Sequence, residues 1–235
     1  MTTIYKLENV SKIYKKSNFE TRALDNINLE IEEGELVVVL GPSGSGKSTL
    51  VNIMSLIDNV TSGDIYYKED NICLFNEKEK IEFVRSIPGF IFQSYNLIPN
   101  LTVKENIELS AHVSSNPMNI DEVIKLVGLK EHKNKFPYQL SGGMMQRVSI
   151  ARALVRNPKV LFCDEPTGAL DEKMGKRILS LLQKVNKKNK TTVIIVTHNP
   201  SIGDIANTVL KMKDGQIIEV IKNKKTKKVN EIGWA

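Results

Sequence analysis

The sequence predicts an α/β protein with a mainly parallel sheet, and three features of the 235-residue chain indicate it. Beyond about residue 155, apolar strand-like runs alternate with amphipathic helical stretches, which is typical of a parallel sheet with helices on its faces. A glycine-rich segment joins the apolar run at 36–40 to a helical stretch at 46–57. Between about 90 and 155 the pattern is helical, which indicates a helical insertion in the α/β core.

In the first part of the chain, short apolar runs predict strands at 4–8, 27–32 and 36–40. The stretch at 46–57 repeats its apolar residues at helical spacing and is predicted as a helix. The runs at 63–67 and 71–75 are expected to form a hairpin or strand pair.

Beyond residue 90, helical patterns come first and the alternation of strands and helices follows. The expected elements are helices at 102–113, 120–129 and 139–155, a strand at 159–164, a helix at 171–187, a strand at 191–196, a helix at 200–206, and a closing hairpin of 209–213 and 216–220. The helix at 171–187 has Ile178, Leu181, Leu182 and Val185 on one face, which is the spacing of a helix packed on a sheet.

The composition is that of a soluble globular protein, with 41% hydrophobic and 26% charged residues. Its longest apolar runs, such as LVVVL at 36–40, are far too short to cross a bilayer. The polar, charged opening of the chain predicts no signal peptide. Cys73 and Cys163 indicate no disulfide framework, so the cytoplasm is the expected compartment.

The net charge of +6 is a local property of the end of the chain. Residues 222–228, KNKKTKK, hold five lysines and no acid, so the rest of the chain carries only +1. A solvated, partly disordered tail at 222–235 is one interpretation, and contact with anionic lipid headgroups is the alternative. Nucleic acid is not expected as a partner, because no aromatic or basic surface stretch accompanies the tail.

The segment GPSGSGKS at 41–48 follows a strand-like run and opens a helix, which is the context of a phosphate-binding loop. Its glycines let the backbone N–H groups point inward, and the helix N-terminus adds partial positive charge. Lys47 is expected to reach the β- and γ-phosphates of a nucleotide, and the Ser48 hydroxyl to bind Mg²⁺. A glycine-rich turn without ligand is the alternative. The candidate nucleotide-binding residues are Gly41, Pro42, Ser43, Gly44, Ser45, Gly46, Lys47, Ser48 and Thr49.

Two acids end the apolar run KVLFCDE at 159–165. Because side chains alternate along a strand, one acid can face a metal ion while the other faces the γ-phosphate and an attacking water. Asp164 is predicted to bind Mg²⁺ and Glu165 to activate the water, which favours hydrolysis over nucleotide binding alone. Acids that cap the next helix are the alternative, which explains only one of the two. His198 ends the next strand and is expected at the same edge of the sheet, within reach of a γ-phosphate oxygen.

The stretch QLSGGMMQRVSIARALV at 139–155 begins as a polar turn and continues as a helix. Ser141 stands where an N-cap is expected, and Gly142 and Gly143 let a ligand approach the backbone closely. This helix end is therefore suited to an anion, although the chain has a stronger phosphate site at 41–48.

Five segments, GPSGSGKS, FQSYN, LSGG, VLFCDEPTGALD and VTHN, occur in this order along the chain. With them the chain resembles, from about residue 4 to 220, the ATP-binding subunit of ABC transporters, and in particular its lipoprotein-release, macrolide-efflux and antimicrobial-peptide-resistance branch. The resemblance implies a P-loop NTPase core with a mainly parallel sheet, an antiparallel β subdomain and an inserted α-helical subdomain. It implies a single ABC ATPase domain at 1–221, followed by the basic tail at 222–235.

The resemblance also implies roles for three residues outside the phosphate-binding loop. Tyr14 is similar to the aromatic residue that stacks on adenine. Gln93 is similar to the glutamine that contacts Mg²⁺ and the attacking water, and Asp171 to the aspartate that joins the sites of two subunits.

In this family two subunits pack head to tail, with ATP and Mg²⁺ between them. The resemblance implies that Ser141, Gly142 and Gly143 of one subunit close over the γ-phosphate held by the partner's 41–48 loop. Loss of the γ-phosphate then reopens the dimer. The chain departs from the family at Met144, where the family usually has Gln. We expect the shared site to persist with altered affinity or interface packing, because Met144 lies one step into the helix and its side chain need not face the phosphate. A defective signature is the alternative.

The predicted function is that of an ATP-binding and ATP-hydrolysing subunit that drives a separate membrane permease, in export or mechanotransmission, from the cytoplasmic face of the cell membrane. Tyr95, Leu97, Ile98 and Leu101 are candidates for docking a permease helix, with burial in the helical lobe as the alternative. A soluble ABC-type ATPase and a non-transporting regulator of a membrane partner are the alternative functions. Soluble members typically carry two nucleotide domains or a long coiled coil, and this chain has neither pattern.

Overall fold

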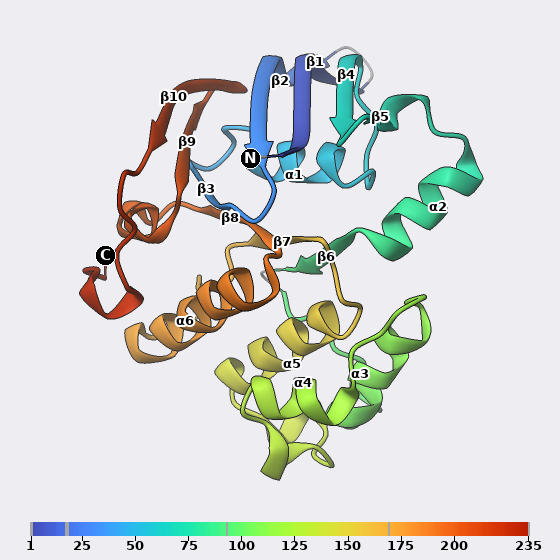
Figure 1. Cartoon of the computed structure of the whole chain (residues 1–235), viewed down its shortest axis with the longest axis vertical. Coiled ribbons are helices and arrows are strands. Elements are labelled where there is room, and N and C mark those ends of the chain that lie inside the picture. The colour runs from blue at the N-terminus through green and yellow to red at the C-terminus, as the bar shows by residue number, and fades with distance from the viewer. Residues whose placement is uncertain (1, 17–18, 93, 169, 235) are drawn as a thin grey trace.

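The computed structural model describes residues 2–16, 19–92, 94–168 and 170–234. Within them, two sheets lie above a group of helices at one end of the molecule (Figure 1). The strands are β1 (Thr3–Lys16), β2 (Phe19–Glu32), β3 (Leu36–Leu40), β4 (Ser62–Tyr67), β5 (Asp70–Asn71), β6 (Pro88–Ile91), β7 (Val160–Asp164), β8 (Thr192–Thr197), β9 (Thr208–Lys213) and β10 (Gln216–Lys222). The α-helices are α1 (Lys47–Met54), α2 (Glu77–Ser86), α3 (Val103–His112), α4 (Ile120–Leu126), α5 (Gly142–Leu154) and α6 (Glu172–Asn189). The 3₁₀ helices are η1 (Ile72–Leu74), η2 (Lys130–His132), η3 (Pro137–Gln139), η4 (Pro200–Ile205) and η5 (Val229–Glu231).

The larger sheet has the strand order β10-β9-β3-β8-β7-β6 and is parallel from β9 to β6, with β10 antiparallel at its edge. Alternate side chains of β3 enter two different cores. Val37 and Val39 pack in the core that contains α1, whereas Leu36 and Val38 pack in the core that contains α5 and α6. Both faces of the sheet are thus buried, which explains the unbroken apolar run of this strand.

The smaller sheet is antiparallel, with the order β2-β1-β4-β5, and α1 lies between it and the larger sheet. β1 and β2 pair from Thr3 and Glu32 to Lys16 and Phe19, so both strands extend far beyond the predicted 4–8 and 27–32. The register shifts several times between Thr3 and Ile13, and each bulge interrupts the alternation of buried and exposed side chains. This interruption hid the rest of both strands in the sequence pattern.

The helices α3, α4 and α5 pack on one another at the end of the molecule opposite the smaller sheet, and α5 also contacts β6 of the larger sheet (Figure 1). α3 begins with a capping box, in which Thr102 accepts from the Glu105 N–H and Glu105 accepts from the Thr102 N–H. The strand β6, which the sequence pattern had not predicted, precedes this group and pairs with β7 in the larger sheet. Its four residues are too few to show a period.

Three further elements differ from the sequence prediction. The hairpin predicted from 63–67 and 71–75 forms between β4 and β5, but its second strand is wrong beyond Asn71, where β5 ends and the Asn71 side chain caps η1. The predicted α-helix at 200–206 is a 3₁₀ helix. α2 was not predicted because it buries only Phe83 among its side chains, although an Asn76–Glu79 capping box marks its start.

Two buried residues anchor the described end of the chain, 222–234, on the fold, whereas its five lysines are exposed, as the interpretation of a solvated tail predicts. Val229 and Ile232 are buried in the core that contains α6. Lys227 forms an ion pair with Asp204 at 2.9 Å. Gly175 of α6 carries no side chain at the place where the Trp234 indole lies.

Candidate active site

The phosphate-binding loop connects β3 to α1, and two of its glycines are required by close contacts. A Cβ atom on Gly41 would lie 2.3 Å from the carbonyl oxygen of Met212, and one on Gly46 would lie 2.4 Å from that of Ala23. Gly46 is the N-cap of α1 and has a φ of 96°, a conformation that glycine adopts without strain. The loop is therefore held against β2 on one side and β9 on the other.

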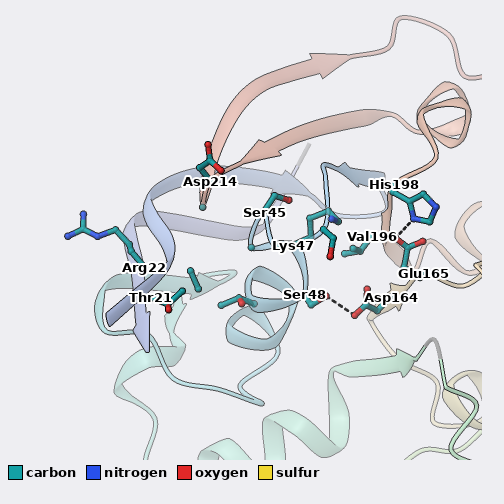
Figure 2. A pocket seen from close by; sticks show the side chains of 16 residues that line it. Thr21, Arg22, Ser45, Lys47, Ser48, Asp164, Glu165, Val196, His198 and Asp214 are labelled. Atoms are coloured by element: carbon teal, nitrogen blue, oxygen red, sulfur yellow. Dashed lines mark hydrogen bonds and ion pairs between the residues drawn. The ribbon is translucent and has the colours of Figure 1, made fainter. Parts of the chain in front are cut away.

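Polar side chains of the loop face a cavity of about 690 Å³ (Figure 2). The Ser45 hydroxyl is buried and has no hydrogen-bond partner among the described residues. The Lys47 side chain donates from Nζ to the carbonyl oxygens of Gly41, at 2.8 Å, and Pro42, at 2.7 Å. An ammonium group has three N–H donors, so one is left for a phosphate oxygen. The buried hydroxyl and the held ammonium fit a phosphate chain in this cavity.

Ser48 and Asp164 meet across the cavity from α1 and the end of β7. The Ser48 hydroxyl donates to Asp164 Oδ2 at 2.9 Å (Figure 2). Burial raises the pKa of Asp164, the hydrogen bond from Ser48 lowers it, and the charge of the adjacent Glu165 raises it again. A nearby cation removes this penalty, because it favours the charged carboxylate. The pair supplies two of the oxygen ligands that Mg²⁺ prefers, and so fits the predicted metal site.

Glu165 follows β7 in a strained conformation, with a φ of 46°. A non-glycine residue in this region costs free energy and is held there only by its surroundings. Its N–H donates to the Val196 carbonyl at 3.0 Å, and its carboxylate accepts from the Thr197 hydroxyl at 3.3 Å. His198 Nδ1 lies 2.9 Å from Glu165 Oε1 (Figure 2). The turn thus aims the carboxylate, which is 15% exposed, into the cavity beside a histidine.

The structure brings most of the predicted residues of the phosphate site together. The cavity is lined by Ser43, Gly44, Ser45, Gly46, Lys47, Ser48, Thr49, Asp164, Glu165 and His198. Gly41 and Pro42 contribute through the carbonyl groups that hold Lys47. Gln93 lies outside the described residues.

Four further predicted residues do not line this cavity in their own chain: Ser141, Gly142, Gly143 and Asp171. Ser141 caps α5 by accepting from the Met144 N–H at 3.4 Å, and Asp171 caps α6 by accepting from the Met174 N–H at 2.9 Å. A Cβ atom on Gly143 would lie 2.5 Å from Met174 Cγ, so the starts of these two helices are in contact. Gly142, whose added Cβ would lie 3.0 Å from Tyr95 Oη, continues this surface.

Two segments of the cavity wall were not predicted from the sequence. Thr21, Arg22 and Ala23 of β2 line it on one side, and Asp214 and Gly215 in the β9–β10 turn line it on another. In the sequence, Asp214 and Gly215 indicate only a hairpin turn and not a place in a binding site. No local pattern marks either segment, because both reach the cavity through strand pairing.

Comparison with known proteins agrees with this geometry. A profile of the family described as "ABC transporter" matches residues 24–168. An ABC transporter ATP-binding protein of Methanocaldococcus jannaschii is 47% identical over 226 residues, which cover 91% of this chain and 97% of that protein. The chain belongs to the ABC transporter family. The family predicted from five short motifs is therefore confirmed.

Two further relatives add detail. The bacitracin export ATP-binding protein BceA of Halalkalibacterium halodurans is 41% identical over 219 residues, covering 91% of this chain and 87% of that protein. The post-hydrolysis dimer of the ATP-binding cassette MJ0796 with ADP and Pi has a TM-score of 0.85 and 40% identity, covering 94% of this chain and 99% of that chain. The chain also spans half the length of two relatives from Mycoplasma species.

The chain is accordingly an ATP-binding cassette and an ATP hydrolase of the ABC type, with the predicted P-loop α/β fold. Across the described residues, no helix combines the length and apolarity that a membrane crossing requires.

Proposed function

We propose that two copies of this ABC cassette close head to tail around ATP and move a membrane permease. One observation carries the proposal. The catalytic groups Lys47, Glu165 and His198 line one cavity, whereas Ser141 at the start of α5 does not line it in its own chain. A helix start made of Ser141, Gly142 and Gly143 that lies outside the phosphate cavity of its own chain fits a phosphate held by a second molecule. The dimeric MJ0796 cassette with ADP and Pi supports this arrangement by similarity.

In each site, we assign the triphosphate to the loop at 41–48 and its first turn, up to Thr49. Mg²⁺, held by Ser48 and Asp164 with Gln93 as a further ligand, would neutralise charge on the β- and γ-phosphates. Glu165 takes the proton of the attacking water. The carboxylate is a fixed acceptor because the turn after β7 and Thr197 hold it.

His198 has a defined protonation requirement in this scheme. A carboxylate only accepts hydrogen bonds, so Nδ1 of His198 donates to Glu165. A contact from Nε2 to a γ-phosphate oxygen then needs a second ring proton. Asp171 and the residues Ser141, Gly142 and Gly143 complete the site from the partner subunit.

For the membrane partner, we propose export or mechanotransmission through a separate permease at the cytoplasmic face of the cell membrane. The similarity to the bacitracin export protein BceA supports export. Among the docking candidates, Ile98 is 36% exposed, whereas Leu97 packs on the helical core. Tyr95 lines a small cavity with Phe92 and Arg152, which offers an apolar and basic site for a permease helix. A non-transporting regulator with the same permease contact is the second candidate, and it differs only in what the permease does.

The basic end of the chain remains our candidate for contact with anionic lipid. Lys224 and Lys225 are exposed in the described part of the tail, next to the packed residues that follow. A lysine near an anionic membrane surface contributes about 1 kcal/mol. This contact would assist recruitment to the permease.

The dimer is tested with Glu165→Gln, which removes the acceptor for the water proton and leaves the shape of the site. We expect hydrolysis to fall at least about 100-fold and a stable dimer to appear with ATP but not with ADP, measured by size exclusion with light scattering. The matched control is Glu77→Gln, since Glu77 is 88% exposed on α2. A monomer in saturating ATP and Mg²⁺ would refute the shared site.

A further inference from the structure

Tyr14 stands at the rim of the nucleotide cavity and is fixed there by other side chains. Its partner across the β1–β2 pair is Thr21, which lines the cavity. The Tyr14 ring is 41% exposed, and its hydroxyl donates to Asp58 Oδ2 at 2.7 Å. The ring is thus an exposed aromatic surface whose far end is held in place by a hydrogen bond.

Lys12 supports the ring from one side. Its Nζ atom lies 4.8 Å from the centroid of the Tyr14 ring, within the range of a cation–π interaction. The same Nζ donates to Asp58 Oδ1 at 2.7 Å and to the Asn59 carbonyl at 2.6 Å. The Lys12 side chain is 11% exposed, so this cation is largely removed from water. With one face of the ring taken, a flat ligand has the opposite face.

Asp58 joins the strand to the nucleotide-binding helix. It follows α1, and its Oδ1 also accepts from the Asn59 N–H at 2.7 Å. Although burial acts to raise the pKa of Asp58, hydrogen bonds from Lys12 and Tyr14 hold it below its usual range. Asp58 is therefore a charged anchor for both side chains.

We propose that Lys12 and Asp58 are positioning residues that hold Tyr14 as the platform for adenine. This inference rests on the adenine-stacking role of Tyr14, which itself follows from the resemblance to the family. α1 carries the phosphate-binding loop at its start and the Asp58 anchor just after its end. The Lys12–Asp58–Tyr14 cluster therefore sets the distance between the base and the phosphates. The cluster therefore contributes to the affinity for ligands that carry a base, such as ATP, and not to the affinity for a phosphate chain alone.

The test compares two ligands, ATP and inorganic tripolyphosphate, each with Mg²⁺, by titration calorimetry. Lys12→Met and Asp58→Asn are expected to weaken ATP binding about 3- to 10-fold, as loss of a desolvated cation–π support predicts. Tyr14→Ala removes the stacking surface and is expected to weaken it about 10- to 100-fold. Binding of tripolyphosphate stays within about twofold of the unchanged protein in all three variants, because it makes no base contact.

Lys15→Met is the matched control. Lys15 lies on the same strand, but its partner is Glu20 and both side chains are largely exposed, at 70% and 60%. We expect it to bind both ligands unchanged. Tyr14→Phe keeps the ring, loses the hydroxyl that donates to Asp58 and also interacts with Thr49, and should weaken ATP binding at least as much as Asp58→Asn.

Each other outcome overturns a defined part of the reasoning. If Tyr14→Ala weakens ATP binding while Lys12→Met and Asp58→Asn do not, the positioning role is refuted and the role of Tyr14 stands. If Tyr14→Ala binds ATP normally, the adenine contact fails and the inference fails with it. If the Lys12 and Asp58 variants bind ATP and tripolyphosphate more weakly by the same factor, the cluster supports the fold of the phosphate-binding loop and does not position the base.

Discussion

Gly175→Ala should stabilise the protein only when Trp234 is absent. Gly175 lies in the first turns of α6, and its N–H donates to the Asp171 carbonyl at 2.8 Å. An added Cβ would lie 2.1, 2.5 and 3.0 Å from three carbon atoms of the Trp234 indole. These separations are far below van der Waals contact, so the indole has to leave.

The magnitude follows from two opposing contributions. Replacing a glycine inside a helix by alanine stabilises it by about 1 kcal/mol. Loss of the partly buried indole costs about 1–2 kcal/mol. We therefore expect Gly175→Ala alone to be neutral or to destabilise the protein by about 1 kcal/mol. In a Trp234→Ala background the same change should stabilise it by about 1 kcal/mol, since the helix gains and nothing is displaced.

Urea unfolding followed by circular dichroism, on all four proteins of this double-mutant cycle, measures the coupling. Its expected value is about 1–2 kcal/mol. Trp234 is the only tryptophan of the chain, so its fluorescence should shift to the red in Gly175→Ala. Equal stabilisation in both backgrounds, with unshifted emission, would refute the packing of the chain end on α6.

Three further predictions concern the site and the tail. Lys47→Ala should abolish nucleotide binding in a fluorescent-ATP titration, because it removes the one cation held inside the loop, and retained tight binding would remove the assignment of residues 41–48. Asp164→Asn should abolish Mg²⁺-dependent hydrolysis and yet raise the melting temperature without nucleotide at neutral pH. The pKa of Asp164 is higher in the folded protein than in the unfolded chain. Ionisation of Asp164 therefore destabilises the folded state fully at pH values above its folded pKa, and has no effect on stability below its unfolded pKa. An unchanged or lower melting temperature would contradict this prediction. The double variant Lys224→Gln, Lys225→Gln should keep its ATPase activity and should sediment less with anionic vesicles than the unchanged protein does, with no difference for zwitterionic vesicles. If the variant and the unchanged protein sediment equally with anionic vesicles, these lysines do not contact lipid.

The phosphate-binding loop and the two acids were predictable because each signal is local. Residues 41–48 carry their glycines, lysine and serine in one run, between a strand and a helix whose periods are easily recognised. Asp164 and Glu165 end an apolar strand, and the rule that parallel strands end at one edge brings His198 to them. The rule places His198 near Glu165, but the sequence did not predict that the two side chains form a hydrogen bond.

The strands β1 and β2 show where local patterns fail. Their bulges break the two-residue period, so only the regular parts at 4–8 and 27–32 were recognised. The missed half of this hairpin contains Tyr14 and Thr21, which are partners across the pair at the rim of the cavity.

The sequence by itself determined the family, the α/β class, the phosphate-binding loop and the ATP-hydrolase class, since these depend on residue type and spacing within one turn or one strand. Only the tertiary structure decided that Lys12 and Asp58, 46 residues apart, meet under Tyr14, that β2 and the β9–β10 turn line the cavity, and that the end of the chain packs on α6. Such contacts arise from strand order and helix packing. They leave no periodic pattern in the residues that make them, because each partner is selected by a neighbour that is distant in the chain.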